Sequence, residues 1–236
     1  MRVTIGLAAL LTGAAAGAVA AGGQASAADR SAIERVVHDY ILAHPEILPE
    51  AMDRLQQREI AKAVRANRAV IEKPFANAWE GAADADVTLV EFFDYACGYC
   101  RASLPDIDRL LREDKHIKIV YREFPVLGPD SEEAARISLA AAKGTRYAAF
   151  HRALYASGRP DTRARSNVAH QFGLNPNESL TPDAAQEIAA NRDLQRALNL
   201  TGTPSWVVGD RVLSGAVGYD GLKAAIAEAR SKRGQS

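Results

Sequence analysis

The residues in this chain best suited to chemistry are two cysteines separated by two residues, Cys97-Gly98-Tyr99-Cys100. They follow an apolar run and open a segment whose apolar residues have helical spacing. A cysteine at the start of a helix meets unpaired backbone N–H groups and the positive end of the helix dipole, and both stabilise a thiolate. Cys100 lies one turn later on the same side. The pattern predicts a redox pair in which Cys97 attacks a substrate disulfide and Cys100 releases the mixed disulfide. Gly98 and Tyr99 tune the pair without adding a cation.

The structural alternative for such a pair is half of a zinc site. Zinc needs two more cysteine or histidine ligands, usually from a second close pair. The chain has no other cysteine, and only His38 and His44 among its five histidines form a close pair. These histidines also precede the cysteines, which is the reverse of the common order. We therefore expect no metal and no cofactor.

Glu91 is the one charged residue in the apolar run from Val87 to Phe93. Strand alternation places it on the same face as Leu89 and Phe93, and its apolar neighbours favour burial. A buried carboxyl has a raised pKa and is able to relay a proton to or from Cys100. The alternative is a side chain that points to solvent.

Residues 1–27 differ in composition from the rest of the chain. Over 236 residues, 29 basic side chains balance 29 acidic ones, which gives no indication of a nucleic-acid partner. In residues 1–27 Arg2 is the only charge, an alanine-rich apolar stretch follows, and small residues end it. This order is typical of a secretory signal peptide cleaved after Ala27; an uncleaved membrane anchor is the alternative. Export would place the cysteine pair where disulfides persist.

Two predicted helices come next, at about 31–44 and 48–72, with a break at His44-Pro45. We assign residues 28–76 to this helical segment. Its apolar stripe allows two interpretations. The segment is either a hairpin packed on its own domain or an oligomerisation stalk that meets other copies of the chain.

The remaining residues, 77–236, have the order of an α/β domain. The patterns predict a buried strand, a helix that begins at Cys97 and a second strand, which together suggest a parallel βαβ unit. A mostly helical stretch, about 127–199, precedes a hairpin around Gly209-Asp210 and a closing helix. Thr203-Pro204 lies just before that hairpin, and base rates alone would make its peptide bond trans.

Together these residues resemble the thioredoxin fold, and more closely the DsbA-like group of exported thiol–disulfide oxidoreductases. The resemblance covers about residues 86–231. It rests on Val-Glu-Phe-Phe-Asp-Tyr-x-Cys-Gly-Tyr-Cys at 90–100, on the helical insertion, and on Thr-Gly-Thr-Pro-Ser-Trp at 201–206. It implies that Pro204 is cis and faces the redox pair, that Thr203 offers backbone hydrogen bonds to substrate, and that Glu91 lies buried beneath the site.

The helical leader extends this resemblance. His-Pro-Glu-Ile-Leu at 44–48 is similar to the suppressor-of-copper-sensitivity protein C (ScsC-like) subgroup, some members of which oligomerise through such a leader and act as disulfide isomerases or reductases. This similarity implies a periplasmic protein with cysteine-containing protein substrates and a membrane thiol–disulfide reductase as partner. It also implies a homo-oligomer, with a trimer as one form. A threonine before Pro204 is more isomerase-like than oxidase-like.

Three functions remain open at this point. The first is a disulfide isomerase or reductase, and the second is a DsbA-like dithiol oxidase. The third is non-enzymatic: a chaperone or a Cu(I)-binding module, because two thiolates suit a soft metal ion.

Overall fold

The computed structural model describes residues 27–177 and 180–234, and it divides the chain into two compact units, Met1–Ala51 and Met52–Ser236. The predicted signal peptide lies outside the described residues except for Ala27, and it stays a prediction. Within the described residues, no helix has both the length and the apolar character that crossing a bilayer requires.

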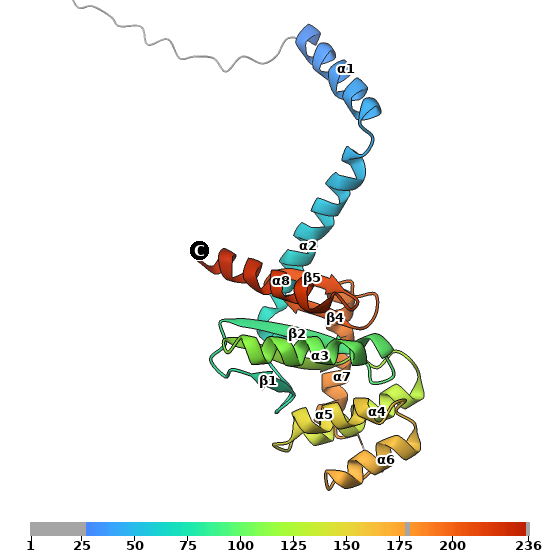
Figure 1. The fold of residues 1–236 in the computed structure, drawn as a ribbon. Coiled ribbons are helices and arrows are strands. Elements are labelled where there is room, and N and C mark those ends of the chain that lie inside the picture. The colour runs from blue at the N-terminus through green and yellow to red at the C-terminus, as the bar shows by residue number, and fades with distance from the viewer. Residues whose placement is uncertain (1–26, 178–179, 235–236) are drawn as a thin grey trace, which may run out of the picture. The chain divides into compact units, whose positions relative to one another are not determined.

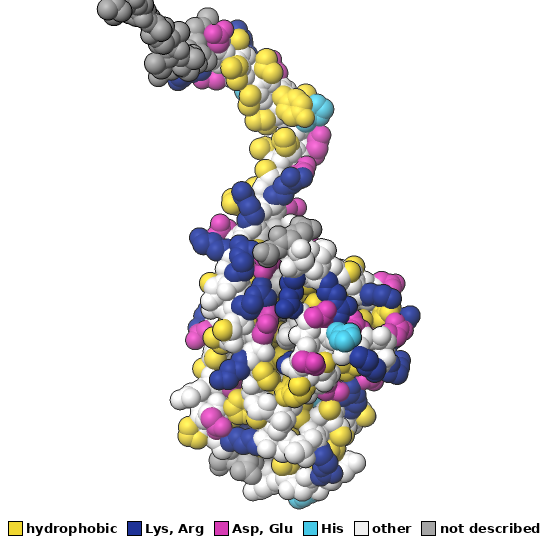
Figure 2. Space-filling view, turned by 90° about the vertical axis from the view of Figure 1, so that its left-hand side faces the viewer, with side chains coloured by type: hydrophobic (Ala, Val, Ile, Leu, Met, Phe, Trp, Pro, Cys, Tyr) yellow, Lys and Arg dark blue, Asp and Glu magenta, His cyan; other side chains and the backbone are white. Residues whose placement is uncertain are grey.

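The first unit contains helix α1 (Ala27–Ala43) and the beginning of helix α2 (Ile47–Ile71). The bounds of both helices agree with the predicted ones to within a few residues, and the break falls at His44-Pro45 as expected. Most of the large apolar side chains of this unit are exposed in the single chain (Figure 2). They are Ile33, Val36, Val37, Tyr40, Leu42, Ile47 and Leu48.

Most of helix α2 belongs to the second unit, where its apolar stripe divides into two parts. Met52 and Leu55 are exposed, whereas Val64 and Ile71 are buried and Ile60 packs beside them. The C-terminal part of the predicted helical segment therefore packs on the chain's own domain. The exposed part has no such cover within the described chain.

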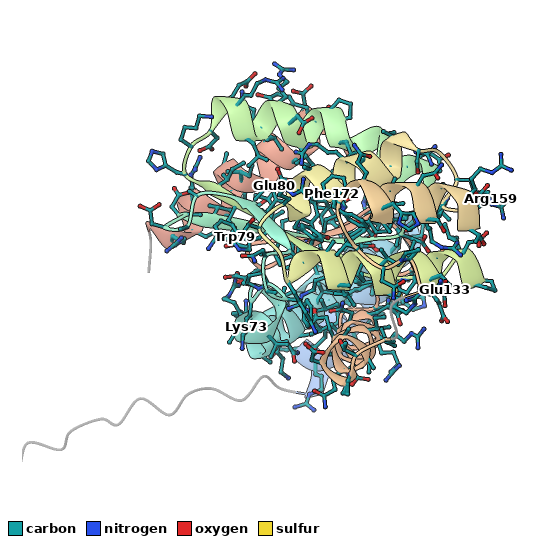
Figure 3. The ribbon with its side chains drawn as sticks, turned by 90° about the horizontal axis from the view of Figure 1, so that it is seen from below. Lys73, Trp79, Glu80, Glu133, Arg159 and Phe172 are labelled. Atoms are coloured by element: carbon teal, nitrogen blue, oxygen red, sulfur yellow. The ribbon has the colours of Figure 1, made fainter. Side chains whose placement is uncertain are left out.

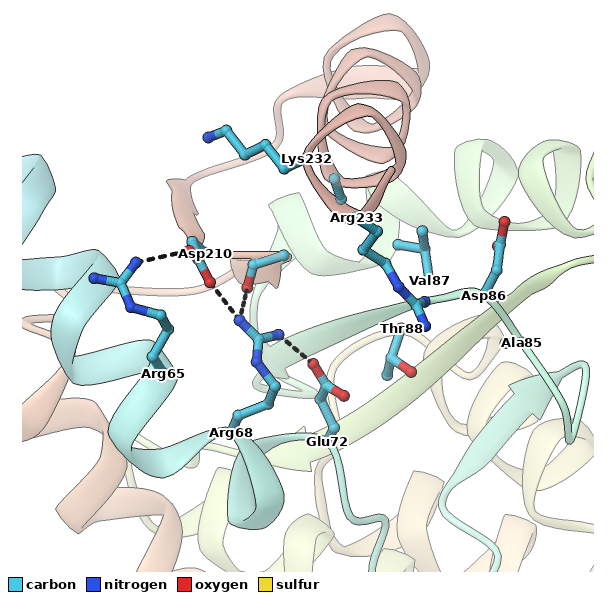
Figure 4. A pocket seen from close by; sticks show the side chains of 12 residues that line it. Arg65, Arg68, Glu72, Ala85, Asp86, Val87, Thr88, Asp210, Lys232 and Arg233 are labelled. Carbon is cyan, nitrogen blue, oxygen red and sulfur yellow. Dashed lines mark hydrogen bonds and ion pairs between the residues drawn. The ribbon is translucent and has the colours of Figure 1, made fainter. Parts of the chain in front are cut away.

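Two arginines of α2 attach this helix to a turn far along the chain. Arg65 and Arg68 both pair with Asp210, and Arg68 also donates to the Gly209 carbonyl and pairs with Glu72. They line a pocket of about 490 Å³, shown in Figure 4. Gly209 has a positive φ of 58°, which the tight turn requires.

The second unit is built on a five-stranded sheet with the order β1-β3-β2-β4-β5 (Figure 1). Strands β2 and β3 are parallel, which confirms the predicted βαβ unit, and all other neighbours are antiparallel. Strands β4 and β5 confirm the predicted hairpin. The bounds are β1 Trp79–Gly81, β2 Val87–Phe93, β3 Ile117–Glu123, β4 Ser205–Val208 and β5 Arg211–Ser214.

Alternation along β2 sets which helices cover which face of the sheet. Leu89 and Phe93 share one buried cluster with helices α3 (Gly98–Glu113) and α8 (Gly218–Arg233). Val90 and Phe92 share another cluster with the end of α2 and with α7 (Pro182–Ala197). The central strand is therefore buried on both sides, as its near-continuous apolar sequence predicts.

The stretch between β3 and β4 is helical, as predicted. Besides α7 it contains α4 (Pro129–Ala142), α5 (Tyr147–Ala156) and α6 (Thr162–Gln171), which contact one another (Figure 1). Helix α5 also contacts β1, where Arg152 pairs with Glu80. Figure 3 labels Trp79 and Glu80 of β1 beside these helices. Helices α4, α5 and α6 thus pack on the side of the sheet that carries Glu91, whereas α7 packs on the other side.

Candidate redox site

Cys97 is the N-cap of helix α3. Its backbone is extended, with φ −80° and ψ 116°, and the helix begins at Gly98. The Cys97 N–H donates to the Asp94 carbonyl at 3.0 Å. Both cysteines are free thiols with little exposure, at 6% for Cys97 and 1% for Cys100. The helix start predicted from the sequence is therefore confirmed.

The surroundings of Cys97 favour its thiolate. A hydrogen bond from the Cys100 thiol is the main reason that the pKa of Cys97 falls to about 5. Hydrogen bonds from the Thr203 side chain and from the backbone N–H groups of Cys100 and Tyr99 lower this pKa further, while burial acts against them. Groups of Cys100, Thr203 and the start of the helix thus favour the ionised sulfur.

Cys100 has the opposite character. Burial raises the pKa of its thiol, and so do its hydrogen bond to Cys97 and the nearby charge of Glu91. Cys100 therefore stays protonated while Cys97 is ionised. This asymmetry suits Cys97 as the attacking thiol and Cys100 as the thiol that resolves the mixed disulfide.

Glu91 is buried beneath this pair, as predicted, with 1% of its surface exposed. Burial raises its pKa well above the ordinary value, and the charge of Cys97 raises it further. Among the described residues, no hydrogen-bond partner is found for its Oε2 atom. The carboxyl group is therefore placed to exchange a proton near Cys100, a role that remains a proposal.

The Thr203-Pro204 peptide bond is cis, as the family resemblance implies. The Cys97 thiol approaches the Thr203 carbonyl oxygen at 3.3 Å, so this loop faces the redox pair. No hydrogen bond of the Thr203 N–H is found within the described chain. That amide is available to the backbone of another polypeptide.

Three exposed apolar side chains form a rim beside the active-site segment. Tyr99 is 72% exposed, and Val126 and Leu127 are also exposed. The N–H groups of Val126 and Leu127 donate to Oδ2 of Asp94, which fixes their loop beside the active-site segment. Val126 also lines a groove of about 370 Å³ that reaches Thr201 and Gly202, just before Thr203.

Four polar side chains lie behind this segment, and no sequence pattern assigned a role to any of them. Tyr95, Ser138, His151 and Tyr155 are buried next to the active-site loop and hydrogen-bond with one another or with its backbone. Only Tyr95 lies in the recognisable motif. The other three come from helices α4 and α5, and their sequence neighbourhood carries no distinguishing pattern.

His38 and His44, considered as zinc ligands, lie exposed in the first unit. The part of the chain described by the structure contains no group of three or more His, Cys, Asp or Glu side chains arranged to hold a metal ion.

A family model described as the DSBA-like thioredoxin domain matches residues 88–227, which includes both cysteines, Glu91 and the Thr203-Pro204 bond. The chain belongs to this family. A second model, the copper resistance protein ScsC N-terminal domain, matches residues 29–62, which form α1 and most of α2.

Solved structures with the same fold include ScsC and other oxidoreductases. A linker-deletion mutant of Proteus mirabilis ScsC, which also carries a point substitution, is 27% identical, with 90% of this chain and all of that chain covered and a TM-score of 0.72. A thioredoxin-like oxidoreductase from Silicibacter pomeroyi DSS-3 is 36% identical, with 69% and 96% covered and a TM-score of 0.65. The thiol–disulfide exchange protein α-DsbA2 from Wolbachia pipientis is 26% identical, with 74% and 97% covered and a TM-score of 0.66. The homologues of this chain are therefore thioredoxin-fold thiol–disulfide oxidoreductases.

Among curated proteins, the chain matches the Na⁺/H⁺ antiporter NhaA 3 of Salinispora tropica at 28% identity over 156 residues. The match covers 63% of this chain and only 24% of the antiporter's length. The likeness is thus confined to about a quarter of that longer protein.

Proposed function

We propose that this protein is a periplasmic thiol–disulfide oxidoreductase that acts as a protein disulfide isomerase or reductase through Cys97 and Cys100. The observation that carries the proposal is the asymmetry of the pair. The pKa of Cys97 is lowered to about 5, mainly by the Cys100 thiol, whereas burial raises the pKa of Cys100. A stabilised thiolate favours the reduced form of the pair, and an isomerase must rest reduced. The same stabilisation makes the pair a stronger oxidant, so the ribonuclease test below decides between isomerase and oxidase.

The neighbouring groups have roles that fit this reaction. The Cys97 thiolate attacks one sulfur of a substrate disulfide, and the other sulfur leaves as a thiolate. Cys100 then gives its proton to Glu91 in its carboxylate form and attacks the Cys97 sulfur. The bond between Cys97 and the substrate sulfur breaks, which releases the reduced substrate and leaves the Cys97–Cys100 disulfide. In isomerisation the freed substrate thiolate attacks instead and restores Cys97. The Thr203 amide and the exposed apolar rim hold an extended substrate segment that carries cysteines.

The direction of exchange is tested on ribonuclease with scrambled disulfides. We expect the reduced mature protein to restore ribonuclease activity, and Cys97→Ser to restore none. The oxidised protein serves as the control because it has no free thiolate with which to begin isomerisation.

Two other outcomes would favour the alternatives. If the oxidised protein converted reduced ribonuclease to its disulfide form while the reduced protein repaired nothing, the protein would be a dithiol oxidase. If neither form exchanged with any disulfide, the enzymatic proposal would be wrong and a binding module would remain.

The export part of the proposal is supported by the composition of residues 1–27, and the reductase partner follows from the need to rest reduced. Each cycle that ends in a Cys97–Cys100 disulfide needs two electrons from outside the protein. The periplasm is an oxidising compartment, so a membrane thiol–disulfide reductase is the proposed source.

The first unit supports a homo-oligomer. In α1 the exposed apolar residues Ile33, Val36, Val37 and Tyr40 recur at helical spacing. Isolated exposed apolar residues are ordinary, whereas a row of them along a helix is typical of a helix–helix interface. We propose that this row meets other copies of the chain, with a trimer as one form.

We expect removal of residues 28–51 to convert the oligomer into a monomer, as measured by sedimentation of the mature protein. The deletion stops at Ala51 because Val64 and Ile71 are buried in the second unit and their loss would expose its core. Val36→Glu with Tyr40→Glu tests the same interface without a deletion. Glu34→Gln on the same helix is the control. Monomeric behaviour of the full mature chain would contradict the proposal.

A further inference from the structure

Helix α5 contacts the segment that leads into Cys97. Tyr95 is buried two residues before Cys97, and its hydroxyl lies 2.8 Å from the Ser138 hydroxyl and 2.9 Å from Nδ1 of His151. His151 belongs to α5 and Ser138 to α4. The helical insertion therefore makes direct hydrogen bonds with the active-site loop.

A second residue of α5 contacts the same loop one helical turn later. The Tyr155 hydroxyl donates to the Asp94 carbonyl oxygen at 3.1 Å, and the Cys97 N–H donates to the same oxygen at 3.0 Å. His151 and Tyr155 lie four residues apart, so they share one face of the helix. One carbonyl thus connects α5 with the backbone of the N-cap cysteine.

The aromatic surroundings of His151 hold its ring in place. The side chain is fully buried, and its ring centroid lies 4.4–5.7 Å from those of five aromatic residues. They are Phe93, Tyr95, Tyr121, Tyr147 and Tyr155. Burial, and then the charge of Arg152, lowers the pKa of His151 to about 3, so the ring is neutral.

The hydrogen bonds of this ring are few. Among the described residues its Nε2 atom has no partner, so the contact with Tyr95 is the one hydrogen bond of a buried imidazole. Burying a polar ring with a single partner is costly, and such cost is often found where a side chain serves the function of a site.

Cys97 is sensitive to small movements of this loop. The donors that stabilise its thiolate include the backbone N–H groups of Tyr99 and Cys100, whose directions depend on where α3 begins. The start of α3 is fixed from behind by the Cys97–Asp94 hydrogen bond. Any contact that sets the position of Asp94 and Tyr95 therefore also sets how well these donors point at the sulfur.

We propose that His151 and Tyr155 are positioning residues through which the helical insertion sets the reactivity of the Cys97–Cys100 pair. The inference rests on the proposed function, since it concerns the same thiolate. It assigns to α5 a part in tuning the reduction potential, in addition to the residues between the two cysteines. Neither side chain takes part in a bond-forming step.

The test compares single-atom and side-chain changes in the full mature protein. Tyr95→Phe and Tyr155→Phe each remove one hydroxyl, and His151→Phe keeps an aromatic ring but removes the ring nitrogen that hydrogen-bonds with Tyr95. His151→Asn restores a polar atom near the position of Nδ1. The control is Tyr121→Phe, which removes a buried hydroxyl from the same aromatic group. The Tyr121 hydroxyl donates to Glu80 of β1 at 2.7 Å, and not to the active-site loop.

Two quantities are measured: the rate at which Cys97 reacts with 4,4′-dithiodipyridine at pH 5, and the reduction potential of the pair in glutathione buffers. We expect Tyr95→Phe, Tyr155→Phe and His151→Phe each to weaken the ionisation of Cys97 about fivefold, the factor that corresponds to one net hydrogen bond. At pH 5 this leaves about a third of the thiolate, and because the more basic thiolate reacts about twofold faster, the rate should fall about 1.5-fold. The reduction potential of the pair should also fall, because the thiolate of the reduced form is less stabilised. His151→Asn should recover part of the loss, and Tyr121→Phe should match the unmodified protein.

Three outcomes would overturn the inference. Unchanged rates and potentials in folded Tyr95→Phe and Tyr155→Phe would show that the contacts serve stability alone. An equal effect of Tyr121→Phe would indicate a response of the whole core. An unmodified Cys97 as slow as free cysteine would overturn the proposed function, and this inference with it. If His151→Phe does not fold, the two tyrosine variants, each of which loses only a hydroxyl, still decide the question.

Discussion

The Cys97 thiol is expected to react with 4,4′-dithiodipyridine roughly forty times faster than free cysteine at pH 5. With the pKa of Cys97 lowered to about 5, mainly by the Cys100 thiol, half of it is thiolate at this pH. Free cysteine, with a pKa of about 8.5, is ionised about a thousand times less. The less basic thiolate is also the weaker nucleophile, which removes a factor of roughly thirty to fifty. The advantage should therefore disappear near pH 7, and at pH 9, where both thiols are ionised, Cys97 should be the slower thiol.

The decisive measurement is the pH dependence of this rate between pH 3 and pH 9. A half-maximal rate near pH 5 is expected. Cys97→Ser leaves only Cys100, whose pKa burial raises, and should show no fast reaction in this range. Cys100→Ala removes the donor with the largest effect on Cys97, and it should move the midpoint to higher pH. A midpoint near 8.5 in the unmodified protein would contradict the assignment of Cys97 as the attacking thiol.

The same pKa has a consequence for stability. Because the folded protein binds the Cys97 proton more weakly than the unfolded chain does, the reduced form gains stability as the pH rises from about 5 towards 9. It loses that stability as the pH falls through 5. The disulfide form has no thiolate and lacks this gain. Glu91 acts in the opposite sense because burial raises its pKa, but it is present in both redox forms. Comparing the two forms removes most of the Glu91 contribution and leaves that of the two thiols. Cys97 dominates it below pH 9 because Cys100 stays protonated there, and the comparison favours a reduced resting state near neutral pH.

Local sequence patterns account for most of the redox site. The apolar run of β2 and the spacing of the cysteines are enough to place the start of α3, because strand and helix periodicity operate over a few residues. The burial of Glu91 follows from its apolar neighbours in the same strand. The cis bond before Pro204 comes only from the family resemblance, since most such bonds are trans.

Other features depend on contacts that a single sequence does not display. The edge strand β1 is not predicted because three residues are too few for alternation to be recognised. The periodicity of α2 predicts a single apolar stripe along the helix. In the structure Val64 and Ile71 of this stripe pack on the chain's own domain, whereas Met52 is exposed. Periodicity shows which side chains share a face, and it does not show what covers them. The contacts of Tyr95 with Ser138 and His151 span 43 and 56 residues, so no local pattern reports them.

Arg122 is a further residue that sequence patterns do not single out, and its removal is expected to destabilise the protein by about 3–5 kcal/mol. Its side chain is 2% exposed. The guanidinium group donates to Glu187 and Asn191 of α7, at 2.7 Å each. It also donates to carbonyl groups at the end of α2, those of Val70, Ile71 and Lys73. This value is the difference in the free energy of unfolding between the unmodified protein and Arg122→Ala, measured by urea denaturation.

The size of this effect follows from what the substitution leaves behind. The last carbonyls of a helix have no partner within the helix, and Arg122 satisfies several of them at once. Without it, these carbonyls and the Glu187 carboxylate would remain buried or half-buried without a cation. Arg122→Met, which restores much of the volume, should therefore recover only a small part of the loss. Arg196→Ala is the control, because Arg196 pairs with Asp193 on the surface and should matter by less than about 1 kcal/mol.

Substitution of Arg122 also tests whether the stability of the fold is independent of the reactivity of Cys97. It joins α2 and α7 to strand β3 on the face opposite Cys97, and the next residues of the chain, Glu123 and Phe124, lead towards the active-site loop. The Phe124 N–H donates to the Phe93 carbonyl at 2.8 Å, which keeps β3 and β2 paired up to that loop. If the opposite face only supports the sheet, the folded fraction of Arg122→Ala should retain the unmodified pH profile of Cys97. If Arg122→Ala lowered the free energy of unfolding by less than about 1 kcal/mol, the role of Arg122 as the anchor of α2 would be contradicted, whatever the pH dependence of the Cys97 reaction rate.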